Sequence, residues 1–161
     1  MVKYENKELC SECGGICCKA MGCHFSPDDF ESITYETLKN KIDEGYISID
    51  WWEGDPTDNN ILDRAYILRI RNVSAPIVDP SFGGICSLLT SSGCPFPFKE
   101  RPKGARALIP SSEGCILEYT KRQCAIDWIP YTNILERLYQ EYESALNEQD
   151  VWKFFLNQLS E

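Results

Sequence analysis

Four cysteines fall within nine residues near the N-terminus, at Cys10, Cys13, Cys17 and Cys18. A fifth, Cys23, follows them, and beside it lies His24, the only histidine of the chain. Thiols crowded in this way favour a soft metal centre, because thiolates are preferred ligands of zinc and of iron–sulfur clusters.

The chain has nine cysteines, an odd number, so complete internal disulfide pairing is impossible. The first residues contain no apolar stretch, and no run of about 18 apolar residues occurs anywhere, so we expect neither a secretory signal nor a spanning helix. A cytoplasmic location follows as an expectation, and there closely spaced cysteines bind metals more often than they form disulfides. Disulfides or a set of buried thiols remain as alternatives.

A length of 161 residues suits a single domain with its own hydrophobic core. We expect one cysteine-cluster domain over 1–161, with a metal-binding part over about 10–130 and C-terminal helices over about 131–160. The net charge of −9 argues against broad nucleic-acid binding and against docking on an anionic membrane.

The segment after the first cysteines begins with a helix signal, Ser26-Pro27-Asp28-Asp29, and Gly45 suits a helix end. This pattern predicts a helix over about 27–44. Alternation then predicts a strand over 46–52, with Ile47, Ile49 and Trp51 on one face and Ser48 and Asp50 on the other. A second strand is expected over 66–70.

The segment 72–130 is rich in proline and is expected to be irregular, whereas apolar spacing predicts helices over about 131–145 and 148–159. Together these elements predict an α+β fold. It would be a small single domain of metal-crosslinked irregular loops, with a few short strands and a helical C-terminus.

The other four cysteines, Cys86, Cys94, Cys115 and Cys124, are spread through the proline-rich segment. We take Cys10, Cys13, Cys17, Cys18, Cys86 and Cys94 as the preferred ligands, and Cys23, Cys115 and Cys124 as secondary ones. Nine thiols exceed one tetrahedral site, so two four-ligand zinc sites, a mononuclear or multinuclear iron site and an iron–sulfur cluster all remain open. His24 either completes a site or is a packed or surface histidine.

The order of the first four cysteines resembles a known family, the cysteine-cluster (CxxCxxxCC) proteins described as zinc- or iron-chelating. The likeness extends over roughly 10–130 and includes Ser26-Pro27-Asp28-Asp29, Gly84-Ile85-Cys86 and Gly93-Cys94. The family then has Arg-Pro, two residues and Cys-Arg, whereas this chain reads Arg101-Pro102-Lys103-Gly104-Ala105-Arg106. The resemblance therefore implies metal binding, with one ligand lost at Ala105 and with Cys115 and Cys124 as its candidate replacements.

The leading hypothesis is a protein that binds zinc or iron through thiolates. A first alternative, motivated by the surplus of thiols over one zinc site, is a redox or iron–sulfur enzyme component that acts in the modification of a protein or peptide. Some members of the family that the chain resembles are associated with lysine methylation of flagellin. The chain has no nucleotide-binding glycine loop that would make it a complete methyltransferase, and the sequence assigns no catalytic residue. A second alternative is a metal-scaffolded interaction module whose helical C-terminus meets a protein or peptide partner.

Two further groups of residues carry expectations. Lys99, Arg101, Lys103 and Arg106 form a basic run, which we interpret as a solvated loop rather than a site for a phosphate or an acidic partner. Trp51-Trp52 is expected to pack in the core rather than to stack on a ligand.

Overall fold

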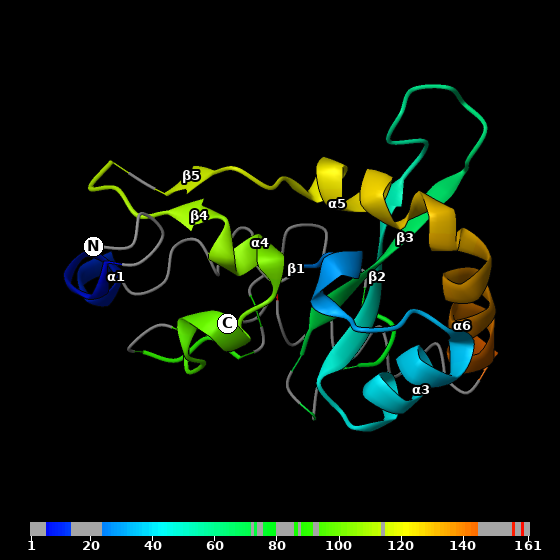
Figure 1. Ribbon diagram of the computed structural model, residues 1–161, viewed down its shortest axis with the longest axis horizontal. Helices are drawn as coiled ribbons and strands as arrows, with labels where there is room; N and C mark the ends of the chain where they lie inside the picture. The colour runs from blue at the N-terminus through cyan, green and yellow to red at the C-terminus, as the bar shows by residue number, and fades with distance from the viewer. Residues whose placement is uncertain are drawn as a thin grey trace.

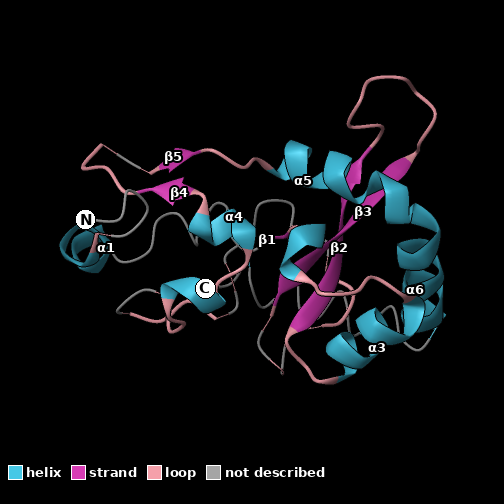
Figure 2. Cartoon of the chain, viewed as in Figure 1, coloured by secondary structure: helices cyan, strands magenta, loops and turns pink. Residues whose placement is uncertain are grey.

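The computed structural model describes residues 6–13, 24–71, 73, 76–79, 86, 88–91, 94–113, 115–144, 156 and 159. Its helices are α1 (Lys7–Cys13), α3 (Tyr35–Asp43), α4 (Lys103–Arg106), α5 (Lys121–Trp128) and α6 (Thr132–Ser144) (Figure 1). Its strands are β1 (His24–Phe25), β2 (Ile47–Glu53), β3 (Arg64–Ile70), β4 (Leu108–Ile109) and β5 (Ile116–Leu117) (Figure 2). Short 3₁₀ turns are η1 (Pro27–Asp29), η2 (Phe98–Glu100) and η3 (Ile129–Tyr131).

Three antiparallel strands in the order β1-β3-β2 form the main sheet. β2 and β3 pair along their whole length, from Ile47 opposite Ile70 to Glu53 opposite Arg64. The segment 76–79 runs parallel beside β2, where the Ile49 amide donates to the Ile77 carbonyl at 2.6 Å. A separate two-stranded sheet joins β4 and β5.

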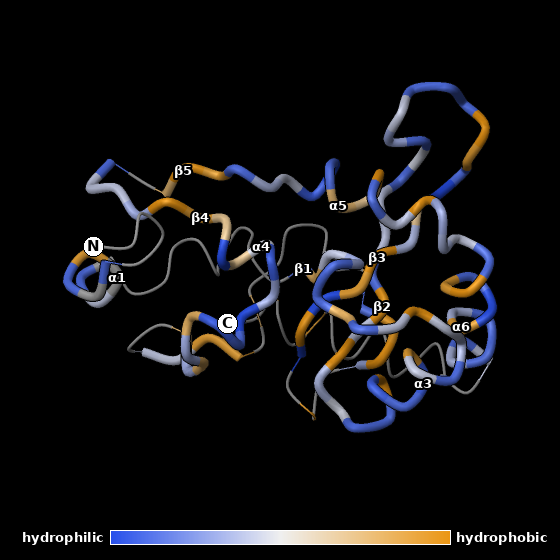
Figure 3. The backbone as a smooth tube through the Cα atoms, in the orientation of Figure 1, coloured by the Kyte–Doolittle hydropathy of each residue, from blue (hydrophilic) through white to orange (hydrophobic). Residues whose placement is uncertain are grey.

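The hydrophobic core lies where α3 and α6 pack beside the sheet and against each other (Figure 1). Its fully buried side chains include Leu38 and Ile42 of α3, Leu135 and Leu138 of α6, and Ile49, Leu68 and Trp128. Apolar stretches along β2 and β3 are visible in Figure 3 as the orange parts of the tube. Burial of these side chains is the main source of stability, at about 1.5–3 kcal/mol for each large apolar residue.

The described residues form an α+β domain of helices and a few short strands, so the expected fold class is confirmed at this level. Both expected strands of the main sheet are present, and α6 matches the helix expected over 131–145. The helix expected over 148–159 lies outside the described residues except for Leu156 and Leu159, which are both helical. Trp51 packs in the core as expected. Among the described helices, none has the length and apolar character needed to cross a lipid bilayer.

The single helix expected over 27–44 was wrong, because the structure has two separate elements there. η1 ends at Asp29, and the next residue, Phe30, has an extended backbone at φ −117° and ψ 136°. The ring of Phe30 packs 5.8 Å from that of Trp128. Helical structure resumes only after Thr34, which forms a reciprocal capping box with Thr37. Tertiary packing of Phe30 therefore overrides a local pattern that would have allowed one continuous helix.

The expectation that 72–130 is irregular was also wrong in part, because the segment includes α4, the β4–β5 pair and α5. α5 begins after Thr120, whose side chain accepts a hydrogen bond from the Gln123 amide at 3.0 Å. A threonine followed three residues later by glutamine is a helix-start signal, so the sequence did contain a local indication of α5.

Gly45 ends α3, as the sequence predicts, in a conformation that other residues rarely adopt. Its φ is +101°, and a Cβ added to it would lie 2.8 Å from Cγ1 of Val73. Gly54, in the turn after β2, also has a positive φ, of +79°, but a Cβ added there would have no atom within 4 Å. A side chain at Gly54 would therefore meet backbone strain alone, whereas a side chain at Gly45 would meet both backbone strain and a steric contact.

We expect Gly54→Ala to lower the free energy of unfolding by about 1–2 kcal/mol, the usual penalty of a left-handed conformation for a residue with a Cβ. Gly45→Ala should lower it further, because the new methyl group also meets Val73. Urea unfolding followed by circular dichroism measures both changes. Equal losses in the two variants would show that Val73 moves aside without resistance.

Candidate functional site

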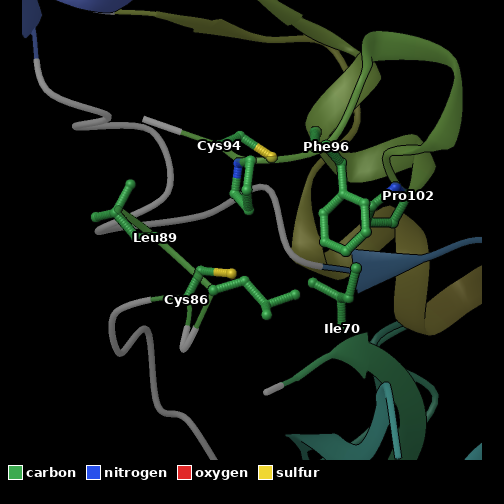
Figure 4. Close-up of a pocket in the computed structure, with 9 residues that line it drawn as sticks. Ile70, Cys86, Leu89, Cys94, Phe96 and Pro102 are labelled. Carbon is green, nitrogen blue, oxygen red and sulfur yellow. The ribbon is translucent and has the colours of Figure 1, made fainter. Parts of the chain in front are cut away.

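Cys86 and Cys94 line one small pocket of about 20 Å³. The other lining residues are Ile70, Leu88, Leu89, Pro95, Phe96, Pro102 and Ala105. Cys86 is buried, with 8% of its surface exposed, and Cys94 is half-buried. In Figure 4 the sulfur of Cys86 is directed toward Ile70 and that of Cys94 toward Phe96. We call this the cysteine pocket.

Four short segments of the chain build the cysteine pocket. Ile70 is the last residue of β3, and Cys86 begins a turn in which the Leu89 amide donates to its carbonyl at 3.1 Å. Phe96 is fixed from the other side, because Nε of Arg101 donates to its carbonyl at 2.9 Å. Pro102 and Ala105 belong to the N-cap and body of α4 and supply the last wall.

Ala105 takes the position at which the family resemblance places a cysteine, and it lines the cysteine pocket together with Cys86 and Cys94. The described lining of the pocket therefore carries two thiols and, at Ala105, a methyl group.

Residues 10–23, which carry the first five cysteines, are called the first cysteine segment. The chain that follows this segment joins the sheet as β1, next to the cysteine pocket. His24 pairs with Arg69 and Phe25 with Leu68, so β1 starts one residue away from Ile70 in the sheet register. α1, which contains Cys10 and Cys13, lies at the end of the molecule that carries β4 and β5, away from α3 and α6 (Figure 1). α4 contacts β1, and in Figure 1 it lies between β1 and α1.

The remaining predicted ligands are placed as follows. The side chains of Cys10 and Cys13, and all of Cys17, Cys18 and Cys23, lie outside the described residues. Cys115 is half-buried immediately before β5. Within the described part of the chain, no three or more Cys, His, Asp or Glu side chains are grouped closely enough to form a metal site.

Cys124, a secondary ligand in the sequence interpretation, lies in the main core on α5. Its side chain is fully buried, and its Sγ donates to the Phe25 carbonyl at 3.3 Å. The indole Nε1 of Trp128 donates to the same oxygen at 2.8 Å. Burial raises the pKa of the Cys124 thiol to about 12, so the protonated form that makes this hydrogen bond is favoured.

His24 is packed within the protein, where its Nε2 lies 3.4 Å from Oδ2 of Asp50. Burial lowers the pKa of the imidazole, although the neighbouring carboxylate opposes this shift. Burial alone would raise the pKa of Asp50, but the hydrogen bond from His24 and the charge of Lys121, 3.5 Å away, hold it below its ordinary value. The alternation of the strand places Asp50 on the face opposite Ile49, and the structure buries it completely.

Asp50 belongs to a buried polar layer on the second face of the main sheet. Ser48 donates from Oγ to the Pro76 carbonyl at 2.6 Å, and Arg69 pairs with Asp79 at 3.6 Å. These side chains are each less than 10% exposed. The start of α5 covers this face, where Lys121 reaches Asp50, and the segment 76–79 along the edge of β2 supplies Asp79 to Arg69. The polar residues that alternate with the core are therefore buried.

The basic run expected to be a solvated loop instead makes specific contacts. Arg101 holds the Phe96 carbonyl, Nζ of Lys103 lies 3.4 Å from Oδ2 of Asp28, and the guanidinium of Arg106 pairs with Asp29. These contacts tie α4 and the segment before it to η1, so this part of the expectation was wrong.

No protein-family model matches this chain, and comparison with curated proteins and with solved structures also gives no match.

We expect the two thiols that the structure places differently to react differently with iodoacetamide at pH 8. Cys94 is half-buried and should be alkylated in the native protein, whereas Cys124 should react only after unfolding in urea, since it is fully buried and its pKa is raised to about 12. Mass spectrometry of peptides from metal-free protein measures both rates. Comparable native rates would place Cys124 outside the core.

Proposed function

We propose that the protein binds a soft metal, zinc or iron, through cysteine thiolates gathered around Cys86 and Cys94. The observation that carries the proposal is that these two residues, separated by a loop, line the same small pocket. Five further cysteines in the first 23 residues are candidates for the remaining metal ligands. The reducing environment expected for the chain would keep them as thiols.

The chemistry of the cysteine pocket suits such an ion. Sulfur is the preferred donor for zinc and for iron–sulfur centres, and the volume of about 20 Å³ matches a single small occupant. Ile70, Phe96 and Pro102 form an apolar surround that would exclude water from the thiolates. Such a shell controls solvent access and thereby the stability and potential of a bound metal.

Two thiols do not complete a tetrahedral site, which takes four ligands. The positions of α1 and β1 favour the first cysteine segment as the source of the others, since α4, which lines the cysteine pocket, contacts β1 and lies between β1 and α1 in Figure 1. Cys10 and Cys13 both belong to α1. Cys86 and Cys94 would then supply two of the four ligands, and the first cysteine segment would supply the other two.

A bound zinc would crosslink the loops, whereas an iron–sulfur cluster would add electron transfer to the same scaffold. The redox component and the interaction module considered from the sequence both use these thiols, so the metal decides between them. Metal and sulfide content together with an optical spectrum, taken on protein purified without air, distinguishes the two. A brown protein with stoichiometric sulfide favours the redox component, and a colourless zinc protein favours the structural role.

Replacing both pocket cysteines, as Cys86→Ser and Cys94→Ser, should greatly weaken metal binding, because two donors are removed. We expect the loss of affinity to exceed the roughly 10–100-fold effect typical of outer-shell changes. Competition with a chromophoric chelator measures it. Cys124→Ser is the matched control and should keep metal content near that of the original chain, since a hydroxyl can still donate to the Phe25 carbonyl.

Absence of zinc and iron from the anaerobically purified protein, together with no uptake on addition of either metal, would contradict the proposed function. Equal weakening by Cys124→Ser, with folding intact by circular dichroism, would instead move the site into the core around α5.

Ala105→Cys should strengthen binding, since it returns a third thiol to the wall of the cysteine pocket. The expected result is a higher affinity for Co²⁺ and stronger sulfur-to-cobalt absorption per bound ion. Ala107→Cys is the control, because Ala107 lies just after α4 and packs against the main core instead. An equal gain in both variants would mean that the pocket wall is not part of the site.

A further inference from the structure

Asp29 carries a carboxylate that is almost completely buried, with 9% of its side chain exposed. It is the last residue of η1, and three donors converge on it. Its Oδ2 accepts from the backbone amides of Ser26 and Lys103, both at 2.9 Å, and its Oδ1 pairs with the guanidinium of Arg106. The carboxylate is therefore fully used by two separate parts of the chain.

Those two parts are the two sides of the proposed metal site. Ser26 directly follows β1, the strand through which the first cysteine segment joins the sheet. Lys103 and Arg106 are the first and last residues of α4, whose Pro102 and Ala105 line the cysteine pocket. One side chain thus bonds the segment after the first cysteines to a wall of the pocket that holds Cys86 and Cys94.

Only an ionised carboxylate meets these demands. It offers two acceptor oxygens and no donor, so it can accept from two amides and a guanidinium together. An asparagine of the same shape would point its NH₂ group at either the guanidinium or the two backbone amides. Two hydrogen-bond donors would then face each other with no acceptor between them. The carboxylate also supplies the counter-charge of Arg106, whose side chain is 36% exposed but whose Nε is buried.

The neighbouring Asp28 makes a contact of a different kind. Its side chain is 81% exposed, and its Oδ2 lies 3.4 Å from Nζ of Lys103. A surface pair of this type contributes little, because both charges are solvated and screened. Asp28 therefore supplies a matched control with the same charge, the same turn and even the same partner residue.

We propose that Asp29 is a positioning residue for the cysteine pocket: it sets α4, and with it Pro102 and Ala105, against the segment that brings in the first cysteines. Its effect on metal affinity rests on the proposed function, whereas its effect on the geometry of the pocket does not. Loss of the carboxylate releases α4 from β1 and opens the pocket wall beside Cys86 and Cys94, while α3, α6 and the main core stay packed.

The test compares Asp29→Asn with Asp28→Asn in the full chain. In metal-free protein, Asp29→Asn should raise the alkylation rates of Cys86 and Cys94 several-fold and leave that of Cys124 unchanged, since α5 belongs to the main core. Its affinity for zinc should fall by about 10–100-fold, as for other residues that position ligands. Asp28→Asn should match the original chain in both measurements.

A second variant covers the case in which Asp29→Asn does not fold. Arg106→Lys keeps the charge and both backbone bonds of Asp29 but removes the planar guanidinium, so a smaller change in the same direction is expected. Circular dichroism and thermal unfolding establish that each variant is folded.

Unchanged alkylation of Cys86 and Cys94 in folded Asp29→Asn would overturn the proposal, and so would a parallel rise at Cys124, which would indicate a general loss of stability. If the original chain takes up no zinc or iron, the proposed function fails, while the alkylation pattern still decides the positioning role. If zinc binds but Asp29→Asn binds it as tightly as Asp28→Asn, the function stands and the positioning role is refuted.

Discussion

Seven residues of β2 pair in antiparallel register with seven of β3, and both faces of this ladder are covered. On one side the apolar residues meet α3 and α6, which bury Leu38 and Leu135 against the strands. On the other side α5 lies over polar side chains. The ladder also carries the segment 76–79 along the free edge of β2 and the two-residue β1, which joins it at Arg69 and Leu68.

Charged side chains are buried on the covered second face of the sheet, where side chains of opposite charge are paired. Asp50 lies between His24 and Lys121, and Arg69 faces Asp79. Burial raises the pKa of Asp79, and the nearby guanidinium partly opposes that shift. Removing one member of such a set leaves its partner buried and uncompensated, which is commonly more damaging than replacing the whole set with apolar residues. These residues therefore behave as one unit that fixes β1, β2 and α5 together.

The cysteine pocket lies at the edge of this framework and depends on it. Ile70 gives the pocket a rigid wall because it ends β3, and α4 gives it a second wall because Asp29 holds that short helix to η1. A helix of four residues has little stability of its own, so its place is set by such contacts. The proposed metal would add a crosslink from the first cysteine segment, in a molecule whose main core already forms from α3, α6 and the sheet.

How much the sequence determined differs from one element to the next. Local signals correctly predicted β2, β3, α6 and the stop at Gly45, because apolar alternation, helical spacing and a glycine that tolerates positive φ act over a few residues. The cysteine pattern proposes Cys86 and Cys94 as ligands, and only the structure places them with Ala105 in the lining of one pocket. It also named Cys124, whose thiol the structure places in the main core.

Only the tertiary structure decided the break after Phe30, the burial of Asp50 and the part played by Asp29. Each depends on residues far away in the chain: Trp128 for Phe30, Lys121 for Asp50 and Lys103 for Asp29. A carboxylate in a turn is typical of a solvent-exposed helix start. Asp29 joins two segments only because a distant segment, α4, places hydrogen-bond donors beside its carboxylate. The sequence by itself thus determined most of the local elements and the number and spacing of the thiols. Long-range packing decided which charges are buried and which cysteines line the same pocket, because both depend on segments that are distant in the chain.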